Sequence, residues 1–310
     1  MLHDVMMTVL VDDATIQSRL SAPDAVRWMG EAIDAHYRGE LIAPPRAHVQ
    51  FADGRIVFTA GQLRGSWFGY RSYDTFESDF ASQVVVVHDQ TSGAARAVAI
   101  GNELGPRRTG AIGAVAADSL SPRHATVAAI IGTGTQARTQ LWALATVRNL
   151  DEVRVFSRDQ HRREAFAQQM TRLMQVKCQS ASSARNAVEG AQIVILATNS
   201  ATSVIDASWL ERGAYVTTLG PKQLDRAEFS LDLAERASVL VTDSLDQLDA
   251  YEPPNILSGT PQRDRLVSLG AVRAGVVTPP GSHQISLFFS VGLAGTEVFL
   301  LDRLAQSLVG

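Results

Sequence analysis

Cysteine and lysine are almost absent from this chain of 310 residues. Cys178 is the only cysteine, which excludes a disulfide framework and a cysteine-based zinc cluster and suits a reducing compartment. Lys177 and Lys222 are the only lysines among the 28 basic residues. Because arginine stays protonated near neutral pH, nearly all of the basic side chains are unsuited to accept a proton.

Long apolar runs are missing as well. The segment from Leu287 to Leu301 comes nearest, but Glu297 interrupts it, so no run reaches the roughly 18 residues that indicate a membrane-spanning helix. The first residues include His3 and Asp4 and lack the basic and then apolar pattern of a leader. We therefore expect a cytoplasmic protein with no membrane partner.

The charge balance and the histidine spacing exclude two further classes. The formal net charge is -4, from 28 basic and 32 acidic residues, so we expect no nucleic-acid partner. No two of the seven histidines stand at H-x-x-x-H spacing, so we predict no metal site. The apolar share of 45% is typical of a globular protein, and the length favours two domains.

The first hundred residues predict one helix and an antiparallel sheet. Apolar side chains at helical spacing favour a helix over Pro23–Tyr37. Asp53-Gly54 separates two short runs and predicts a hairpin. Strands are expected at residues 48–51, 55–59, 67–76, 83–88 and 94–100. A helix rich in alanine and glycine is expected at 102–119, and Ser121-Pro122 breaks the chain after it.

The following stretch has a different pattern, in which short apolar runs alternate with helical or loop segments. Strands are expected at residues 126–131, 152–156, 192–197, 214–219 and 238–241. This alternation is typical of a parallel sheet with crossover helices, so we predict an α/β protein. Residues 291–309 predict a helix that packs back on the first domain. The predicted domains are 1–121 plus 291–310 and 122–290.

The most informative segment is residues 129–137, which read AIIGTGTQA and fit G-x-G-x-x-A between a strand and a helix. In such a loop Gly132 permits the tight turn, and Gly134 lets the backbone approach a pyrophosphate. The following helix begins near Thr135 and Gln136, and its N-terminus attracts phosphate groups. We therefore predict a dinucleotide site here.

Two later strand ends add candidate cofactor residues. The second strand of this region runs into Ser157 and Arg158, where an NAD site usually has a carboxylate for the ribose 2′-hydroxyl. A hydroxyl and a guanidinium suit a 2′-phosphate, which favours NADP over NAD, although Asp159 leaves NAD open. Thr198 follows the third strand and is a predicted cofactor neighbour, because ligands bind beyond the carboxyl ends of such strands.

Three arginines of the first domain are candidates for binding a carboxylate. Arg46 follows two prolines, Arg71 lies inside a predicted strand, and Arg108 lies where a predicted helix begins. A guanidinium binds a carboxylate with two parallel hydrogen bonds. Surface or interdomain ion pairs are the alternative for each of them.

Four segments together resemble the ornithine cyclodeaminase/mu-crystallin family. They are R-T-G-A at 108–111, I-G-T-G-T-Q-A-R-T-Q at 131–140, D-Q-T-S-G at 89–93 and S-L-F-F-S-V-G-L-A at 286–294. The resemblance implies a Rossmann domain inserted into a substrate and dimerisation domain. It implies a homodimer joined through the first-domain sheets, and NAD(P)-dependent oxidation of a small amino acid or reduction of an imine by hydride transfer at the α-carbon.

The resemblance also assigns residues. Arg46 and Arg108 resemble the ligands of the substrate carboxylate, and Thr109 resembles a neighbour of the cofactor phosphates. Ser290 and Val291 resemble residues beside the nicotinamide.

Three departures separate the chain from ornithine cyclodeaminases. Arg71 stands where the family has a lysine and cannot act as a base. The short loop after Gly220 contains no aspartate, and we expect the nearby Asp225 to start the next helix. Phe289 stands where the family has a second lysine. A substrate ammonium would have only Glu77 or Asp79 to receive it. The expected function is therefore an amino or imino acid oxidoreductase, with ornithine cyclodeamination and an NADPH-loaded sensor as alternatives.

Overall fold

The computed structural model describes residues 8–76 and 82–309, which form two compact units. The first unit contains the described residues up to Arg108 and those from Leu293 onward, and the second contains Thr109–Gly292. The division falls inside α3 (Leu104–Leu120), so this helix belongs to both units. α3 has 17 residues, and no helix in the described ranges is long and apolar enough to cross a membrane.

The first unit is built on a seven-stranded sheet in the order β1-β7-β6-β5-β4-β2, with β3 paired to β4. All of its pairs are antiparallel except β1 with β7. The strands are β1 (Val9–Val11), β2 (Leu41–Ile42), β3 (Ala47–Gln50), β4 (Arg55–Leu63), β5 (Trp67–Asp74), β6 (Gln83–Asp89) and β7 (Ala95–Gly101). The helices are α1 (Asp13–Arg19), α2 (Ala22–Tyr37) and α11 (Thr296–Val309).

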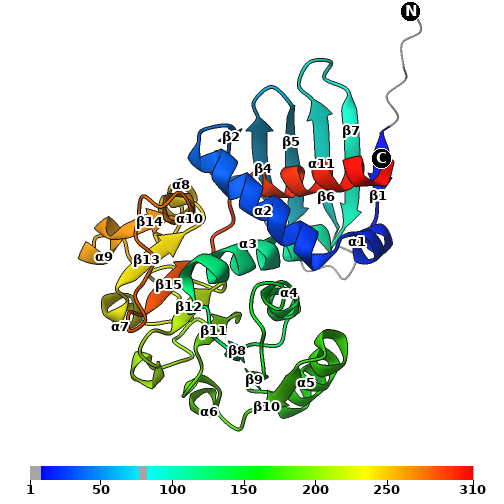
Figure 1. Ribbon diagram of the computed structural model, residues 1–310. Helices are drawn as coiled ribbons and strands as arrows, with labels where there is room; N and C mark the ends of the chain where they lie inside the picture. The colour runs from blue at the N-terminus through cyan, green and yellow to red at the C-terminus, as the bar shows by residue number, and fades with distance from the viewer. Residues whose placement is uncertain (1–7, 77–81, 310) are drawn as a thin grey trace, which may run out of the picture. The chain divides into compact units, whose positions relative to one another are not determined.

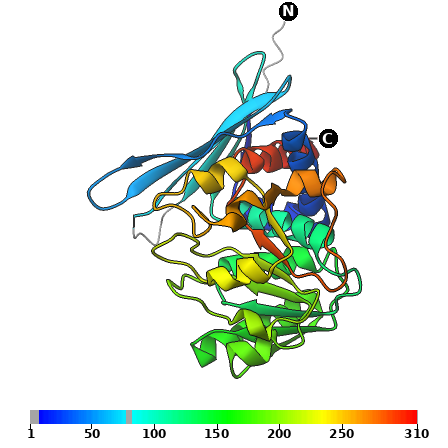
Figure 2. The same ribbon diagram turned by 90° about the vertical axis from the view of Figure 1, so that its left-hand side faces the viewer.

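Helix α11 runs across strands β4 to β7 and packs against α2, as Figure 1 shows. Both helices lie on one side of the sheet, which we call its inner face (Figure 2). Strand alternation places Trp67 and Gly69 on the inner face and Phe68 and Tyr70 on the outer face. The inner face therefore supplies the core of this unit.

The second unit contains an eight-stranded parallel sheet in the order β10-β9-β8-β11-β12-β15-β13-β14, which can be followed in Figure 1. The chain order reverses at β8, which makes the carboxyl ends of β8 and β11 the switch point of a doubly wound sheet. This arrangement confirms the predicted α/β class. The strands are β8 (Val127–Ile131), β9 (Glu152–Phe156), β10 (Lys177–Ser180), β11 (Ile193–Leu196), β12 (Tyr215–Thr218), β13 (Val239–Thr242), β14 (Leu266–Ser268) and β15 (Ser286–Phe289).

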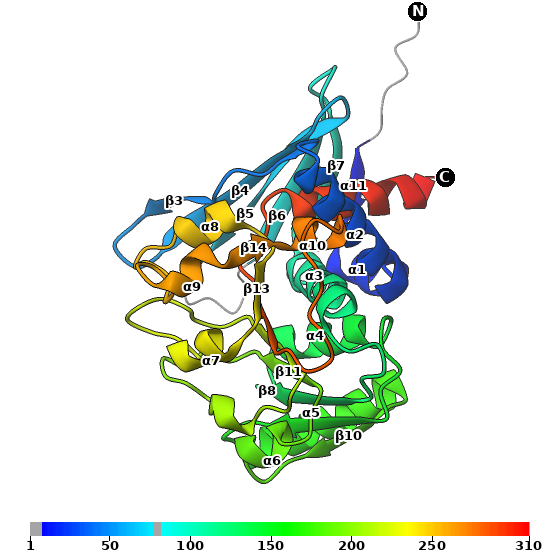
Figure 3. The same ribbon diagram turned by 60° about the vertical axis from the view of Figure 1, so that its left-hand side comes forward.

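Short helices connect these strands, and α4, α5 and α6 are labelled in Figure 3. α4 packs on β11, α5 on β9 and β10, and α6 on β8 and β9. The helical segments are α4 (Thr135–Leu144), α5 (Gln160–Met174), α6 (Ala184–Val188), η1 (Ala207–Trp209), α7 (Leu231–Arg236), α8 (Leu245–Asp249), α9 (Pro261–Asp264) and α10 (Leu269–Arg273).

A buried arginine holds the C-terminal end of α3 within the second unit. Arg148 donates hydrogen bonds to the carbonyl oxygens of Ala117 at 2.9 Å and Ser121 at 3.0 Å. It also pairs with the carboxylate of Asp118 at 2.9 Å. Its side chain is 2% exposed, so these bonds satisfy helix carbonyls that have no partner inside the helix.

The segment after β14 differs from the prediction. The expected helix over 291–309 begins only at Thr296, and residues 286–289 form β15 between β12 and β13. The backbone N–H groups of Val291 and Gly292 bond to the Asp243 carboxylate, so they do not enter a helix. β15 is fully buried, and its short apolar run shows no strand alternation in the sequence.

Candidate active site

The loop after β8 has the backbone that a dinucleotide loop requires. Gly132 has a φ of +118°, a value that residues with a side chain rarely adopt. A Cβ atom here would lie 2.1 Å from the carbonyl oxygen of Ala197, which directly follows β11. Glycine at this position therefore lets the carboxyl ends of β8 and β11 come close together.

Helix α4 begins at this loop with a first turn that no side chain caps. Gly134 is its N-cap residue, and a Cβ atom there would meet no heavy atom within 4 Å. Thr135 is exposed, and the buried Oε1 atom of Gln136 has no hydrogen-bond partner among the described residues. Free N–H groups, open space and an unsatisfied polar atom fit the diphosphate of a dinucleotide.

The turn after β9 contains the residues that are predicted to face the ribose. The Asp159 carboxylate accepts a hydrogen bond from the backbone N–H of Arg162 at 3.0 Å and caps α5. Ser157 donates its hydroxyl to the Asp159 carbonyl at 3.0 Å. Arg158 is exposed and has no ion pair within residues 8–76 and 82–309. The carboxylate is therefore engaged by its helix, whereas the guanidinium remains available.

A buried glutamate connects the carboxyl ends of β11 and β12. Oε2 of Glu228 accepts hydrogen bonds from the backbone N–H of Thr198 at 2.9 Å and from its hydroxyl at 2.8 Å. Oε1 accepts from the hydroxyl of Thr218 at 2.7 Å and from the backbone N–H of Gly220 at 2.6 Å. Glu228 thus holds Thr198 at the switch point, a role for which the sequence shows no signal.

A second buried carboxylate holds the segment after β15. Asp243 follows β13 and accepts hydrogen bonds from the backbone N–H groups of Val291 and Gly292, each at 2.9 Å. Ser290 donates its backbone N–H to the Thr218 carbonyl at 3.1 Å. The two predicted nicotinamide neighbours, Ser290 and Val291, therefore lie at the same edge of the sheet as the glycine loop.

Two of the three predicted carboxylate-binding arginines meet on one glutamate in the first unit. Arg71 Nη1 lies 2.7 Å from Oε1 of Glu297, and Arg108 Nη2 donates to the same oxygen. Arg71 also donates its Nε–H to Gln83 at 3.0 Å and lies 4.2 Å from the ring centre of Tyr73. The side chains of Arg71, Arg108 and Glu297 are 12%, 7% and 0% exposed, and we call these three residues the arginine–glutamate cluster.

The cluster keeps its charges at neutral pH. Burial by itself raises the pKa of Glu297, but Arg108 and Arg71 outweigh it and lower that pKa to about 2. Burial lowers the pKa of Arg71, and the charge of Glu297 opposes this effect. Two guanidinium groups and one carboxylate leave the cluster with one net positive charge.

The cross-strand register relates Arg46, which directly precedes β3, to Arg71 of the cluster. Thr59 of β4 pairs with Arg71 of β5, and Ala47 of β3 pairs with Phe58 of β4. One further step of the second register sets Arg46 opposite Thr59. The hydroxyl of Thr59 is buried with no hydrogen-bond partner among the described residues. The register thus relates Arg46 to Arg71 through Thr59, whereas Arg108 lies on helix α3.

Two paired glycines allow Glu297 to reach Arg71. Gly61 of β4 pairs with Gly69 of β5 on the inner face. A Cβ atom on Gly61 would lie 2.5 Å from Cα of Gly295, and one on Gly69 would lie 2.5 Å from Cγ1 of Val298. The N-terminal end of α11 therefore rests directly on the sheet backbone, which explains how Glu297 is brought to the arginines.

Helix α3 continues from Arg108, the last residue of this part of the first unit, to Thr109, the first residue of the second unit. Arg108 is followed by Thr109, whose carbonyl accepts a hydrogen bond from Gln140 of α4 at 3.1 Å. A Cβ atom on Gly110 would lie 2.3 Å from the Thr139 carbonyl, so the backbones of α3 and α4 are in contact. The predicted substrate ligand Arg108 and the predicted cofactor residue Thr109 are consecutive residues of one helix.

The departures from the cyclodeaminase pattern can also be placed. The expectation that Asp225 starts a helix is wrong, because it lies in an exposed bend closed by the pairing of Lys222 with Ala227, and α7 begins at Leu231. Phe289 is 1% exposed and packs edge to face on Phe229, so no charged group replaces the lysine there. Residues 77 and 79 lie outside the described residues.

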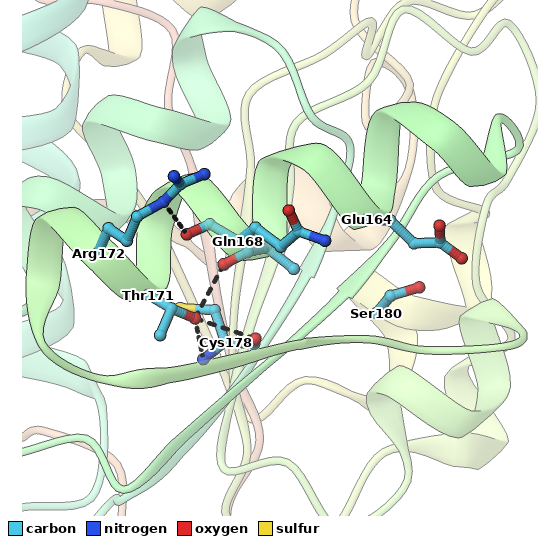
Figure 4. A pocket seen from close by; sticks show the side chains of 7 residues that line it. Glu164, Gln168, Thr171, Arg172, Cys178 and Ser180 are labelled. Atoms are coloured by element: carbon cyan, nitrogen blue, oxygen red, sulfur yellow. Dashed lines mark hydrogen bonds between the residues drawn. The ribbon is translucent and has the colours of Figure 1, made fainter.

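A pocket of about 470 Å³ on the second unit involves none of the predicted site residues. It lies between α5 and β10 and is drawn in Figure 4. Thr171 donates its hydroxyl to the Ala167 carbonyl at 2.9 Å and accepts the backbone N–H of Cys178 at 3.0 Å. Burial raises the pKa of the Cys178 thiol, so this side chain is a poor nucleophile.

A comparison with protein families identifies the chain. The model of the ornithine cyclodeaminase/mu-crystallin family matches residues 6–307. The chain belongs to this family. An uncharacterized cyclodeaminase of Sinorhizobium fredii is 39% identical over 194 residues, which cover 62% of this chain and 58% of that relative.

Two further proteins match over greater lengths. The alanine dehydrogenase of Archaeoglobus fulgidus is 25% identical over 305 residues, which cover 94% of this chain and 92% of that protein. The structure of Thermococcus litoralis Δ(1)-pyrroline-2-carboxylate reductase in complex with NADH and L-proline matches with a TM-score of 0.88. It is 25% identical and covers 97% of both chains.

Proposed function

We propose that the protein is an NAD(P)-dependent oxidoreductase that interconverts a small amino acid and its imine. The observation that carries this proposal is helix α3, which holds Arg108 in the arginine–glutamate cluster and continues with Thr109 onto α4. The cluster has a net positive charge and suits the carboxylate of an amino acid. The pyrroline-2-carboxylate reductase and alanine dehydrogenase relatives act on substrates of this class.

A nicotinamide cofactor held by the glycine loop after β8 would supply the hydride that reduces the iminium carbon to the amine. Arg108 and Arg46 hold the substrate carboxylate, and the positive cluster orients it. Arginine side chains are unsuited to proton transfer near neutral pH, so the proton on the substrate nitrogen comes from the iminium itself or from water. The contribution of the chain is thus binding, orientation and charge.

The test combines cofactor titration with turnover. NADPH and NADH are titrated by nicotinamide fluorescence, and absorbance is then followed with cyclic imino acids, with pyruvate plus ammonia, and with ornithine. Oxidation of the cofactor by an imino acid supports the proposal. Release of ammonia from ornithine with catalytic NAD would identify a cyclodeaminase instead. Tight binding without turnover of any substrate would identify a binding or sensor protein.

A matched pair of variants tests the carboxylate site. Arg108→Gln removes a buried charge and is expected to raise KM for the imino acid about a hundredfold. Arg107→Gln removes the neighbouring arginine, which pairs with Glu103, and is expected to leave KM nearly unchanged. Equal effects of the two substitutions would contradict a carboxylate site at Arg108.

We also propose that the cofactor is NADP. Asp159 is engaged as the cap of α5, and the Ser157 hydroxyl donates to the Asp159 carbonyl, whereas the exposed Arg158 suits a 2′-phosphate. Arg158→Ala is expected to weaken NADPH binding about tenfold or more and to leave NADH binding unchanged. Arg162→Ala, which removes another exposed arginine of the same segment, serves as the control. Equal losses for both cofactors would contradict this assignment.

The outer face of the first-unit sheet supports the proposed homodimer. Leu10, Phe58, Phe68, Tyr70 and Ile100 are between 39% and 75% exposed on neighbouring strands. Large exposed apolar side chains gathered on one face of a sheet are typical of a protein–protein interface. Tyr70→Glu is expected to halve the mass measured by sedimentation, whereas Leu173→Glu, at an exposed position of α5, is expected to leave the mass unchanged. A monomeric wild-type protein would overturn this proposal.

A further inference from the structure

The arginine–glutamate cluster has a charge balance that the substrate must complete. Arg71 and Arg108 share Oε1 of Glu297, and one net positive charge remains. Glu297 lies in α11, far along the chain from both arginines, and is 0% exposed. A carboxylate without a solvent contact acts strongly on any charge that binds beside it, because little water screens it.

Several polar atoms of the cluster are buried without a partner. The Nε atom of Arg108 and the Oε2 atom of Glu297 have no hydrogen bond within the part of the chain that the structure describes. The nearby hydroxyl of Thr59 is also buried and unpaired. Buried polar groups are normally satisfied, so this arrangement is incomplete without a polar ligand.

We propose that Glu297 is a specificity-determining residue that favours substrates with a single carboxylate over substrates with two. This inference rests on the proposed function. One carboxylate from the substrate neutralises the cluster. A second carboxylate bound beside the cluster meets the negative charge of Glu297 and gains no compensating cation from it. The argument concerns the charge that Glu297 contributes and holds whichever arginine receives the substrate carboxylate.

The charge of Glu297 can be removed without changing its size. Glu297→Gln raises the net charge of the cluster from one to two. The ratio of succinate affinity to butanoate affinity is expected to rise about tenfold, because the repulsion of the second carboxylate is removed. A purely structural Glu297 would weaken both ligands by the same factor and leave the ratio unchanged.

The probes are butanoate and succinate, which share a four-carbon chain and carry one and two carboxylates. Their dissociation constants are measured by calorimetry on the full-length protein saturated with NADPH. Glu31→Gln removes an exposed glutamate that pairs with Arg27 and Arg303, and serves as the control with an unchanged ratio.

A second comparison covers the case in which Glu297→Gln folds poorly. In Arg71→Met the cluster has no net charge, because Arg108 and Glu297 remain. In the double variant with Arg71→Met and Glu297→Gln the cluster has one positive charge and no carboxylate. The double variant is expected to show a succinate-to-butanoate ratio about ten times that of Arg71→Met. An equal ratio in these two variants would overturn the specificity role.

The outcomes also separate this inference from the proposed function. A wild-type protein that binds NADPH and prefers butanoate, with the ratio shifted by Glu297→Gln, supports both. Binding of NADPH and carboxylates with a ratio insensitive to Glu297 overturns the inference alone. A wild-type protein that binds neither NADPH nor a carboxylate overturns the proposed function itself.

Discussion

Replacing Gly61 by alanine places one methyl group in the contact that positions Glu297. The added Cβ atom would lie 2.5 Å from Cα of Gly295 and 3.3 Å from its nitrogen. Carbon atoms in contact are normally about 3.5–4.0 Å apart, so the two backbone segments must separate by about 1 Å. Overpacking of this kind costs about 1–3 kcal/mol.

The same displacement reaches the arginine–glutamate cluster. The distance of 2.7 Å between Arg71 Nη1 and Glu297 Oε1 would grow beyond the limit of a hydrogen bond if α11 moved away. A hydrogen bond between charged groups contributes about 1.5–3 kcal/mol. Because part of the strain relaxes, we expect Gly61→Ala to lower the free energy of unfolding by about 2–5 kcal/mol.

The assay is urea unfolding followed by circular dichroism, together with carboxylate binding by calorimetry. Gly281→Ala is the matched control, because the nearest atom to its Cβ would be Oε1 of Gln284 at 3.4 Å, an ordinary contact. Gly61→Ala is expected to lose both stability and carboxylate affinity. If the stability and the carboxylate affinity both stay within error of the wild-type values, the position of α11 on the sheet does not depend on this close approach, and the reasoning is refuted.

Three further predictions concern buried charges. Asp243→Ala removes the acceptor of the Val291 and Gly292 N–H groups and is expected to lower kcat about tenfold or more and to cost about 1–3 kcal/mol in urea unfolding. An unchanged kcat would refute a positioning role. Arg148→Met leaves the end of α3 unsatisfied and is expected to cost about 3–5 kcal/mol in urea unfolding, and a cost under about 1 kcal/mol would contradict it. Because the folded pKa of Glu297 is about 2, below its usual 4.5, its stabilisation is complete above pH 4.5 and is lost as the pH falls through 2. The stability of Glu297→Gln should therefore fall less between pH 4.5 and pH 2 than that of the wild-type protein. Identical dependences of stability on pH for the two proteins would contradict the ion pairs of the cluster.

The dinucleotide loop was predictable because all of its requirements are local. A strand, a tight turn and a helix N-terminus follow one another within residues 127–144, and the spacing of the glycines indicates the backbone conformation of the turn. The alternation of strands and helices likewise reports a parallel sheet. The start of the last helix was predicted wrongly, because a contact with Asp243 diverts the backbone at Val291 and Gly292.

The carboxylates that hold the site were not predictable in the same way. Glu228 lies 30 residues beyond Thr198, and Asp243 lies 48 residues before Val291. In the sequence Glu297 is one acidic residue in an apolar run, and it suggested only that the run does not span a membrane. No local pattern marks such residues, because their partners lie far away in the sequence.

The sequence by itself determined the fold class, the family, the glycine loop and the candidate arginines. These features depend on chain-local geometry and on residue types whose chemistry is the same wherever they stand. Only the tertiary structure decided that Arg71 shares a carboxylate with Arg108, since Arg71 and Glu297 are 226 residues apart. The physical reason is the pairing of Gly61 with Gly69, which lets α11 lie on the sheet and brings a buried negative charge to two positive ones.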